Sequence, residues 1–131
     1  MEILFSEGWV KHFTNKWNKN TEIVTQLAEA NFDAIIAFGY TQPEHPEVTI
    51  EIKNGLIVHA QPYSAGLLGT PEWDLRAEPE QWLKWRGNGP GIGGLGVAIA
   101  SNQLQFRAGD YRRMIRQPML AGPFLKFFAF L

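Results

Sequence analysis

The chain has 131 residues, a formal net charge of −1 at pH 7, and 45% hydrophobic residues. That length suits one domain with one core, and the hydrophobic content excludes an intrinsically disordered chain. The near-neutral charge offers no basic face for nucleic acid. The sequence has no cysteine, which excludes disulfides, thiol catalysis and cysteine-ligated metals.

Neither end of the chain predicts a targeting or membrane segment. The N-terminal residues lack the basic head and long apolar run of a signal peptide. No segment reaches the roughly 18 apolar residues of a membrane-spanning helix, and the last residues are not a Ser-Lys-Leu peroxisomal address. We therefore expect a soluble, cytoplasmic protein with no integral membrane segment.

The first predicted helix runs from Glu7 to about Asn18, with Ser6 as its N-cap. Its spacing predicts one aromatic face, because a large ring recurs at every fourth position: Trp9, Phe13 and Trp17. Such a face is typical of a helix that packs on a core. A second short helix is predicted over Glu22 to Ala30.

The middle of the chain predicts a β-meander. Phe32 to Tyr40 has apolar residues at both alternating sets of positions, as in a central strand that is covered on both faces. Val48 to Lys53 and Leu56 to Gln61 flank Asn54-Gly55. An Asn-Gly pair between two strand-like runs is the strongest short-range hairpin signal.

The predicted hairpin places a histidine among apolar residues. A two-residue turn sets a register in which Ile50 lies opposite His59, so His59 shares a face with Ile52 and Ile57. A buried imidazole needs a hydrogen-bond partner. We interpret His59 either as a satisfied or edge-exposed histidine, or as a polar group that orients a ligand head group inside an apolar cavity.

Residues 72–110 are predicted to enclose an apolar space. Two strands, Glu72 to Ala77 and Gln103 to Ala108, alternate polar and apolar residues. On the first strand, this alternation places Glu72, Asp74 and Arg76 on a solvated charged face.

Two short helices are predicted between these strands. The first follows Glu78-Pro79, a favourable helix start, and the second covers Leu95 to Ala100. The Gly-rich run Gly87 to Gly96 contains a G-x-G-x-x-G spacing. A dinucleotide site needs a strand before the glycines, and here a helix precedes them. The run is therefore interpreted as a flexible connector.

The C-terminal part predicts a helix after Asp110 that carries Met114 on its apolar side, and then an almost uniformly apolar segment. In Met119 to Leu131, the only charged side chain is Lys126. Three interpretations stay open for this segment. It packs on the body as a final helix that covers the cavity, it pairs with another subunit, or it touches a membrane surface.

A strand ending in Asp-Leu-x-Ala, a short helix with a Trp, and a strand running into Gly-Asp together resemble the sterol carrier protein 2 family of lipid-binding domains. The residues that carry this resemblance are Asp74, Leu75, Ala77, Trp82, Leu83, Leu104, Gly109 and Asp110. The opening Leu4-Phe5-Ser6-Glu7-Gly8-Trp9 is similar to that of stand-alone bacterial members. The resemblance spans nearly the whole chain and implies one lipid-binding domain, residues 1–131. It implies an α/β (α+β) fold, a single mixed five-stranded sheet covered by helices, with an apolar cavity.

The resemblance also implies a function. It implies non-enzymatic binding and transport of a hydrophobic small molecule in an apolar tunnel: a fatty acid, a fatty acyl-CoA, a sterol or another lipid. Burial of apolar surface would supply the affinity. The ligand-binding residues that we expect are Trp9, Phe13, Trp17, Phe38, Trp82, Trp85, Leu104, Phe106, Met114, Phe124, Phe127 and Phe128, with His59 as a polar contact. No cofactor is expected, and the three histidines lack the spacing of metal ligands.

Two other functions stay open. The first is a small cavity enzyme of cyclase or isomerase type, which would need a carboxylate such as Asp33 or Asp74 beside His59. The second is an interaction module with a solid core, which forms a homodimer through the apolar C-terminal segment.

Overall fold

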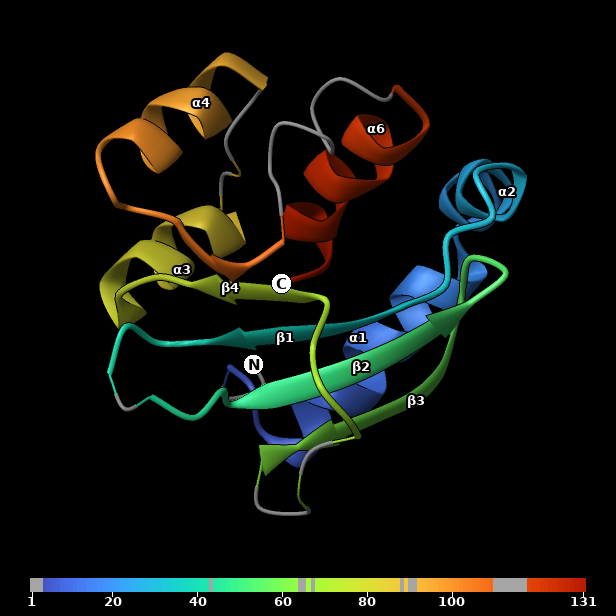
Figure 1. Ribbon diagram of the computed structural model, residues 1–131, viewed down its shortest axis with the longest axis horizontal. Helices are drawn as coiled ribbons and strands as arrows, with labels where there is room; N and C mark the ends of the chain where they lie inside the picture. Colours follow the sequence, from blue (N-terminus) through green and yellow to red (C-terminus); the bar gives the residue numbers. More distant parts are fainter. Residues whose placement is uncertain are drawn as a thin grey trace.

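The computed structural model describes residues 4–42, 44–63, 66, 68–87, 89, 92–109 and 118–131. Its strands form one five-stranded sheet in the spatial order β3-β2-β1-β4-β5, and helices pack against it (Figure 1). In chain order the elements are α1 (Glu7–Lys19), α2 (Thr21–Glu29), β1 (Ala34–Gly39), β2 (Val48–Lys53), β3 (Leu56–Pro62), β4 (Trp73–Arg76), α3 (Pro79–Gly87), α4 (Ile92–Ala100), β5 (Gln105–Ala108), α6 (Pro118–Phe127) and the 3₁₀ turn η2 (Phe128–Phe130).

Strand β1 lies at the centre of the sheet. It pairs antiparallel with β2, where Ile36 lies opposite Ile50, and parallel with β4, where Phe38 lies opposite Leu75. Strand β3 extends the hairpin at one edge, and β5 pairs antiparallel with β4 at the other. The predicted single mixed sheet of five strands is confirmed.

Capping and periodicity explain where α1 lies. Ser6 Oγ accepts a hydrogen bond from the Trp9 backbone N–H at 3.3 Å, as an N-cap does. The predicted aromatic face is buried, since Trp9, Phe13 and Trp17 all belong to the core. Asn20 both ends α1 and caps α2 through its side chain, so the two helices follow each other without a loop.

The hairpin between β2 and β3 has the predicted turn. Asn54 and Gly55 have φ angles of 52° and 81°, the left-handed values that a two-residue type I′ turn requires. Next to the turn the predicted register also holds, because Ile52 lies opposite Ile57.

A bulge makes the predicted position of His59 wrong. Beyond Ile52 the register shifts, and His59 lies opposite Glu51 instead of Ile50. One extra residue turns the following side chains to the other face of a strand. The His59 side chain is therefore 68% exposed, with Nε2 4.0 Å from the Glu51 carboxylate, whereas Ile57 before the bulge stays in the core.

The predicted solvated face of β4 is wrong for Asp74 and Arg76. Arg76 is 1% exposed, and its Nε and Nη2 donate to the two carboxylate oxygens of Asp74 at 2.6 and 3.0 Å. Its guanidinium also donates to the backbone carbonyls of Tyr40 and Glu44, at 3.2 and 2.6 Å. The connection between β1 and β2 thus covers this face of β4 and satisfies the donors of the buried guanidinium.

The Gly-rich run is partly helical. Helix α4 begins at Ile92, so the connector interpretation is wrong for the second half of the run, and the predicted helix at Leu95 begins earlier. Leu95 and Ala98 are each 2% exposed, which shows that burial of one face outweighs the low helix propensity of glycine. Helix α3 precedes the run, so the strand that a dinucleotide site needs is not there.

The apolar C-terminal segment packs on the body. Phe127, Phe128 and Leu131 are each at most 5% exposed, and the Trp9 indole N–H donates to the Leu131 carbonyl at 3.1 Å. Lys126 forms an ion pair with α2. The packing of this segment on the body as a final helix is confirmed, whereas the cavity that it was expected to cover is not seen among the described residues.

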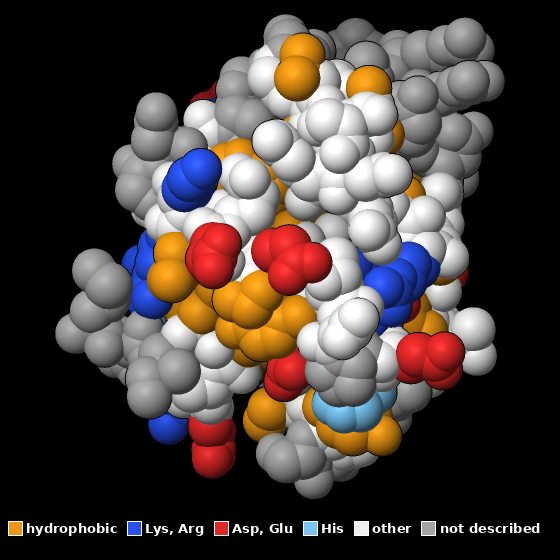
Figure 2. Space-filling view, turned by 90° about the vertical axis from the view of Figure 1, so that its left-hand side faces the viewer, with side chains coloured by type: hydrophobic (Ala, Val, Ile, Leu, Met, Phe, Trp, Pro, Cys, Tyr) orange, Lys and Arg blue, Asp and Glu red, His pale blue; other side chains and the backbone are white. Residues whose placement is uncertain are grey.

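One end of the molecule, formed by α3, α4 and the β1–β2 connection, has a mixed surface. Figure 2 shows hydrophobic side chains there between acidic and basic ones. Leu83 of α3 and Val97 of α4 are 57% and 66% exposed, and single exposed apolar residues of this kind are ordinary. Among the described residues, no helix is long and apolar enough to cross a membrane.

Candidate functional site

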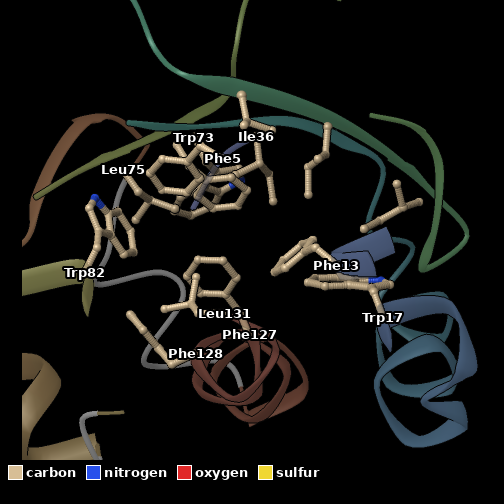
Figure 3. Close-up of a cluster of buried hydrophobic side chains, with 14 of the residues drawn as sticks. Phe5, Phe13, Trp17, Ile36, Trp73, Leu75, Trp82, Phe127, Phe128 and Leu131 are labelled. Atoms are coloured by element: carbon tan, nitrogen blue, oxygen red, sulfur yellow. The ribbon is translucent and has the colours of Figure 1, made fainter. Parts of the chain in front are cut away.

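The core between the sheet and the helices contains most of the residues expected to bind ligand. Figure 3 shows this cluster, with rings from α1, α3 and the C-terminal segment below the strands. Nine of the expected residues are at most 5% exposed: Trp9, Phe13, Trp17, Phe38, Trp82, Trp85, Leu104, Phe127 and Phe128. The fold therefore brings together residues that lie up to 119 positions apart in sequence, from Trp9 to Phe128.

Phe127 lies at the centre of this aromatic core. Its ring stacks on Phe38 of β1, with centroids 4.7 Å apart and planes 11° apart. It also meets Phe13 of α1 edge-on at 5.5 Å, Phe128 at 4.8 Å, and Trp82 of α3 at 6.2 Å. Rings at these separations touch, so the expected apolar cavity is not seen between them.

Three tryptophans are fixed in this core by hydrogen bonds as well as by packing. The Trp17 indole N–H donates to the Gly55 carbonyl at 2.8 Å, and that of Trp82 donates to the Gly39 carbonyl at 2.9 Å. The third donor is Trp9, bonded to Leu131 as described above. Each of these three indoles thus has a partner, which ties the helices to the hairpin, to β1 and to the end of the chain.

Three further expected ligand-binding residues lie at the margin of this core or outside the described part. Phe106 is half-buried on the edge strand β5, where its ring meets Trp73 edge-on at 6.1 Å. Met114 and the side chain of Phe124 lie outside the described residues.

Phe5 belongs to the core although sequence reasoning did not select it. It is 5% exposed, and its ring meets Trp9, Tyr40 and Trp82 at 5.0, 5.5 and 5.5 Å. The signal was available, because an apolar residue directly before an N-cap often packs back on the first helical turn. Phe5 precedes the cap Ser6.

Tyr40 stands where this core meets the buried ion pair. Burial raises the pKa of its phenol above the ordinary value of 10.0, and the nearby carboxylate of Glu47 raises it further. The phenol therefore stays neutral at physiological pH. The backbone carbonyl of Tyr40 accepts a hydrogen bond from the Arg76 guanidinium. Tyr40 is a structural link between the core and the ion pair.

His59 lines a groove that contains none of the aromatic core residues. This groove has a volume of about 470 Å³ and lies between α1 and β3. The residues that line it are Glu7, Val10, Lys11, Thr14, Asn15, Val58, His59, Ala60, Gln61 and Pro62. His59 is thus placed in a lining of mixed polar and apolar residues, apart from the aromatic rings with which it was expected.

The two carboxylates that were considered as partners of His59 in an enzyme have other partners, and the carboxylate nearest to His59 is that of Glu51, at 4.0 Å. Asp33 accepts a hydrogen bond from the Asn54 backbone N–H at 2.9 Å, and Asp74 pairs with Arg76. Among the described residues, no cluster of three or more His, Asp or Glu side chains could hold a metal ion. The arrangement as a whole is suited to apolar contact.

Comparison with known proteins identifies the fold. No protein-family model matches the sequence, and no curated protein sequence matches it either. Solved structures do match. A crystal structure of sterol carrier protein 2 has a TM-score of 0.68 at 16% sequence identity, and the match covers 96% of this chain and 97% of that one.

Two further structures resemble the chain over nearly its whole length. The first is the conserved hypothetical protein TT1886 of Thermus thermophilus, whose description suggests a sterol carrier protein, with a TM-score of 0.65, 14% identity, and coverage of 96% and 87%. The second is UbiJ-SCP2, described as a ubiquinone synthesis protein, with a TM-score of 0.60, 11% identity, and coverage of 97% and 93%. Together with the mixed sheet and its covering helices, these matches show that the chain has the sterol carrier protein 2 fold.

Proposed function

We propose that the protein is a carrier that binds a hydrophobic small molecule in its aromatic core. The observation that carries this proposal is the match of 96–97% of the chain to sterol carrier protein 2 structures. The ligand classes are fatty acids, fatty acyl-CoA, sterols and other lipids. The similarity to a ubiquinone synthesis protein adds quinone lipids to these classes.

The physical basis of binding is apolar burial. The core offers rings and aliphatic chains, and each 100 Å² of ligand surface removed from water contributes about 2.5 kcal/mol. Because the described rings touch one another, a ligand has to displace some of them. The indole-bonded tryptophans are held by hydrogen bonds, so Phe127 and Phe128 of the C-terminal segment are the rings that we expect to move.

The proposed carrier acts without catalytic residues or a cofactor. Its proposed location is the cytoplasm, and it acts as a transporter of the ligand that it binds. The homodimer through the C-terminal segment stays a prediction. The burial of Phe127, Phe128 and Leu131 within the chain limits what that segment could offer to a second subunit.

Lipid analysis tests the proposal directly. The purified protein is measured by native mass spectrometry, and its organic extract is then analysed for lipids. A co-purifying lipid at near-stoichiometric level is expected. The ligand-free protein should then take up a fluorescent fatty acid and change its tryptophan emission, because Trp85 lies 5.3 Å from Phe128, one of the rings expected to move.

A pair of variants locates the site. Phe106→Asp places a charge at a half-buried position that packs against the core and is expected to abolish uptake. Leu83→Asp, at a position 57% exposed, is the matched control. Unchanged uptake by a folded Phe106→Asp protein would contradict the role of Phe106. A wild-type protein that carries no lipid and takes up no fatty acid would contradict the carrier and favour the interaction module.

A further inference from the structure

At the outer edge of β3, one side chain makes the backbone hydrogen bonds that a neighbouring strand would otherwise make. Strand β3 lies at the edge of the sheet. At Ile57, the Asn18 side chain of α1 donates from Nδ2 to the backbone carbonyl at 3.0 Å and accepts at Oδ1 from the backbone N–H at 2.9 Å. A carboxamide has the donor and acceptor of a peptide group. The outer edge of β3 is therefore suited to amide partners.

Beyond Asn18 this edge faces the groove. The Tyr63 backbone N–H donates to the Glu47 backbone carbonyl at 2.8 Å, so this N–H points inward, toward the segment that leads into β2. Along an antiparallel strand the backbone groups of successive residues point alternately to one side and the other. The N–H and C=O of Ala60, and the C=O of Pro62, are therefore directed toward the groove that α1 leaves open.

The size of the groove fits a short stretch of extended chain. Its volume of about 470 Å³ lies within the roughly 300–1,000 Å³ typical of ligand sites. Its wall also holds Thr14, whose buried hydroxyl has no hydrogen-bond partner in the structure. The groove thus offers both a backbone edge and side-chain polar groups.

Charges on α1 set the charge pattern that a bound segment needs. Glu7 and Lys11 both line the groove, four residues apart on the helix and so about 6 Å apart along its axis. Residues i and i+2 of a strand face the same side about 6.6 Å apart. Glu7, at the start of α1, lies near Pro62, at the end of β3, because Glu7 and Pro62 also line a second hollow together. Asn18, near the end of α1, contacts Ile57, near the start of β3. Helix α1 therefore runs antiparallel to β3.

We propose that this groove is a docking site for an extended peptide segment of a partner protein, which adds as a strand to the outer edge of β3. The segment runs antiparallel to β3 and carries a basic residue opposite Glu7 and, two positions later, an acidic residue opposite Lys11. The β3 edge of a second copy of this chain, Leu56-Ile57-Val58-His59-Ala60-Gln61-Pro62, has no such charge pair and is therefore not the occupant that we propose.

Peptide binding tests the proposal by fluorescence anisotropy with the full chain. The probe is a labelled hexapeptide, Ser-Arg-Val-Glu-Val-Ser, and its partner is the charge-swapped Ser-Glu-Val-Arg-Val-Ser. We expect the first peptide to bind at least about tenfold more tightly than the second. The double variant Glu7→Lys, Lys11→Glu should reverse this preference. Lys16→Glu is the matched control, because Lys16 is exposed on α1 and does not line the groove.

A backbone variant separates strand addition from simple charge attraction. Ala60→Pro removes the N–H directed to the groove, and proline is tolerated where a strand N–H faces outward. The folded variant should lose peptide binding by about tenfold or more. An unchanged peptide affinity in the Ala60→Pro variant, or the same affinity of the wild type for both peptides, would overturn the proposal. So would sedimentation that shows a dimer dissociated by Ala60→Pro, since a second copy would then fill the groove.

Discussion

Truncation of Phe127 should be among the most destabilising single changes in this protein. The ring is 2% exposed and meets Phe13, Phe38, Trp82 and Phe128. Phe127→Ala therefore removes contacts with α1, β1, α3 and η2 at once. Because these elements come from both ends and the middle of the chain, little local rearrangement can refill the space.

The magnitude follows from area and from packing. An aromatic side chain buries about 150–250 Å², which at about 25 cal/mol per Å² gives roughly 4–6 kcal/mol as an upper bound. Measured Phe→Ala substitutions in cores cost about 3–5 kcal/mol. We expect a loss of about 4 kcal/mol in the free energy of unfolding. The stack with Phe38 should contribute about 0.5–1.5 kcal/mol of this as a pairwise term.

Urea unfolding followed by tryptophan fluorescence measures this loss. A double-mutant cycle with Phe38→Leu and Phe127→Leu isolates the pairwise term. Phe127→Leu keeps most of the volume, so it should cost less than Phe127→Ala and remains measurable if the alanine variant does not fold. Leu83→Ala, at a position 57% exposed, is the control. A loss below about 1 kcal/mol for Phe127→Ala would refute the central role of this ring.

Three further changes test other parts of the fold, each by the same unfolding measurement. Asp74→Ala leaves the buried Arg76 charge without its carboxylate and should cost about 3–5 kcal/mol, whereas the double change Asp74→Ala, Arg76→Leu should recover part of that loss. Gly55→Ala should lower the free energy of unfolding more than Gly66→Ala does. Both glycines have a positive φ, of 81° and 95°, but only at Gly55 would an added Cβ overlap a backbone oxygen, that of Val24. The raised pKa of Tyr40 stabilises the fold below the unfolded-state pKa of about 10, and this contribution is lost as the pH rises through the folded-state pKa. Stability measured from pH 9 to 12 should therefore fall more steeply for the wild type than for Tyr40→Phe, and equal slopes would contradict the assigned shift.

Local signals predicted much of the fold. The Asn-Gly pair predicted the turn between β2 and β3 because left-handed φ angles at two successive residues suit few other pairs. The aromatic residues of α1 predicted a buried face because their spacing matches the helical period. These features depend on residues within one or two turns of one another, so a sequence alone carries them.

The position of His59 could not be predicted in this way. Strand alternation assumes an unbroken register, and one extra residue reverses every later assignment. Nothing in Leu56-Ile57-Val58-His59 marks the bulge, since no glycine is present. The bulge becomes intelligible only with α1 in place, because Asn18 takes both backbone groups of Ile57 and thereby fixes the strand just before the register shifts.

Arg76 shows a second limit, which is set by distance along the chain. Alternation correctly placed Asp74 and Arg76 on the same face of β4, but whether that face meets water depends on Tyr40 and Glu44, more than 30 residues earlier. A buried arginine is tolerated only where carboxylate and carbonyl oxygens meet its donors. The sequence held one of these acceptors, Asp74, two residues away. A charged pair at i and i+2 on a strand is therefore compatible with burial as well as with exposure, and only the path of the β1–β2 connection decides between them.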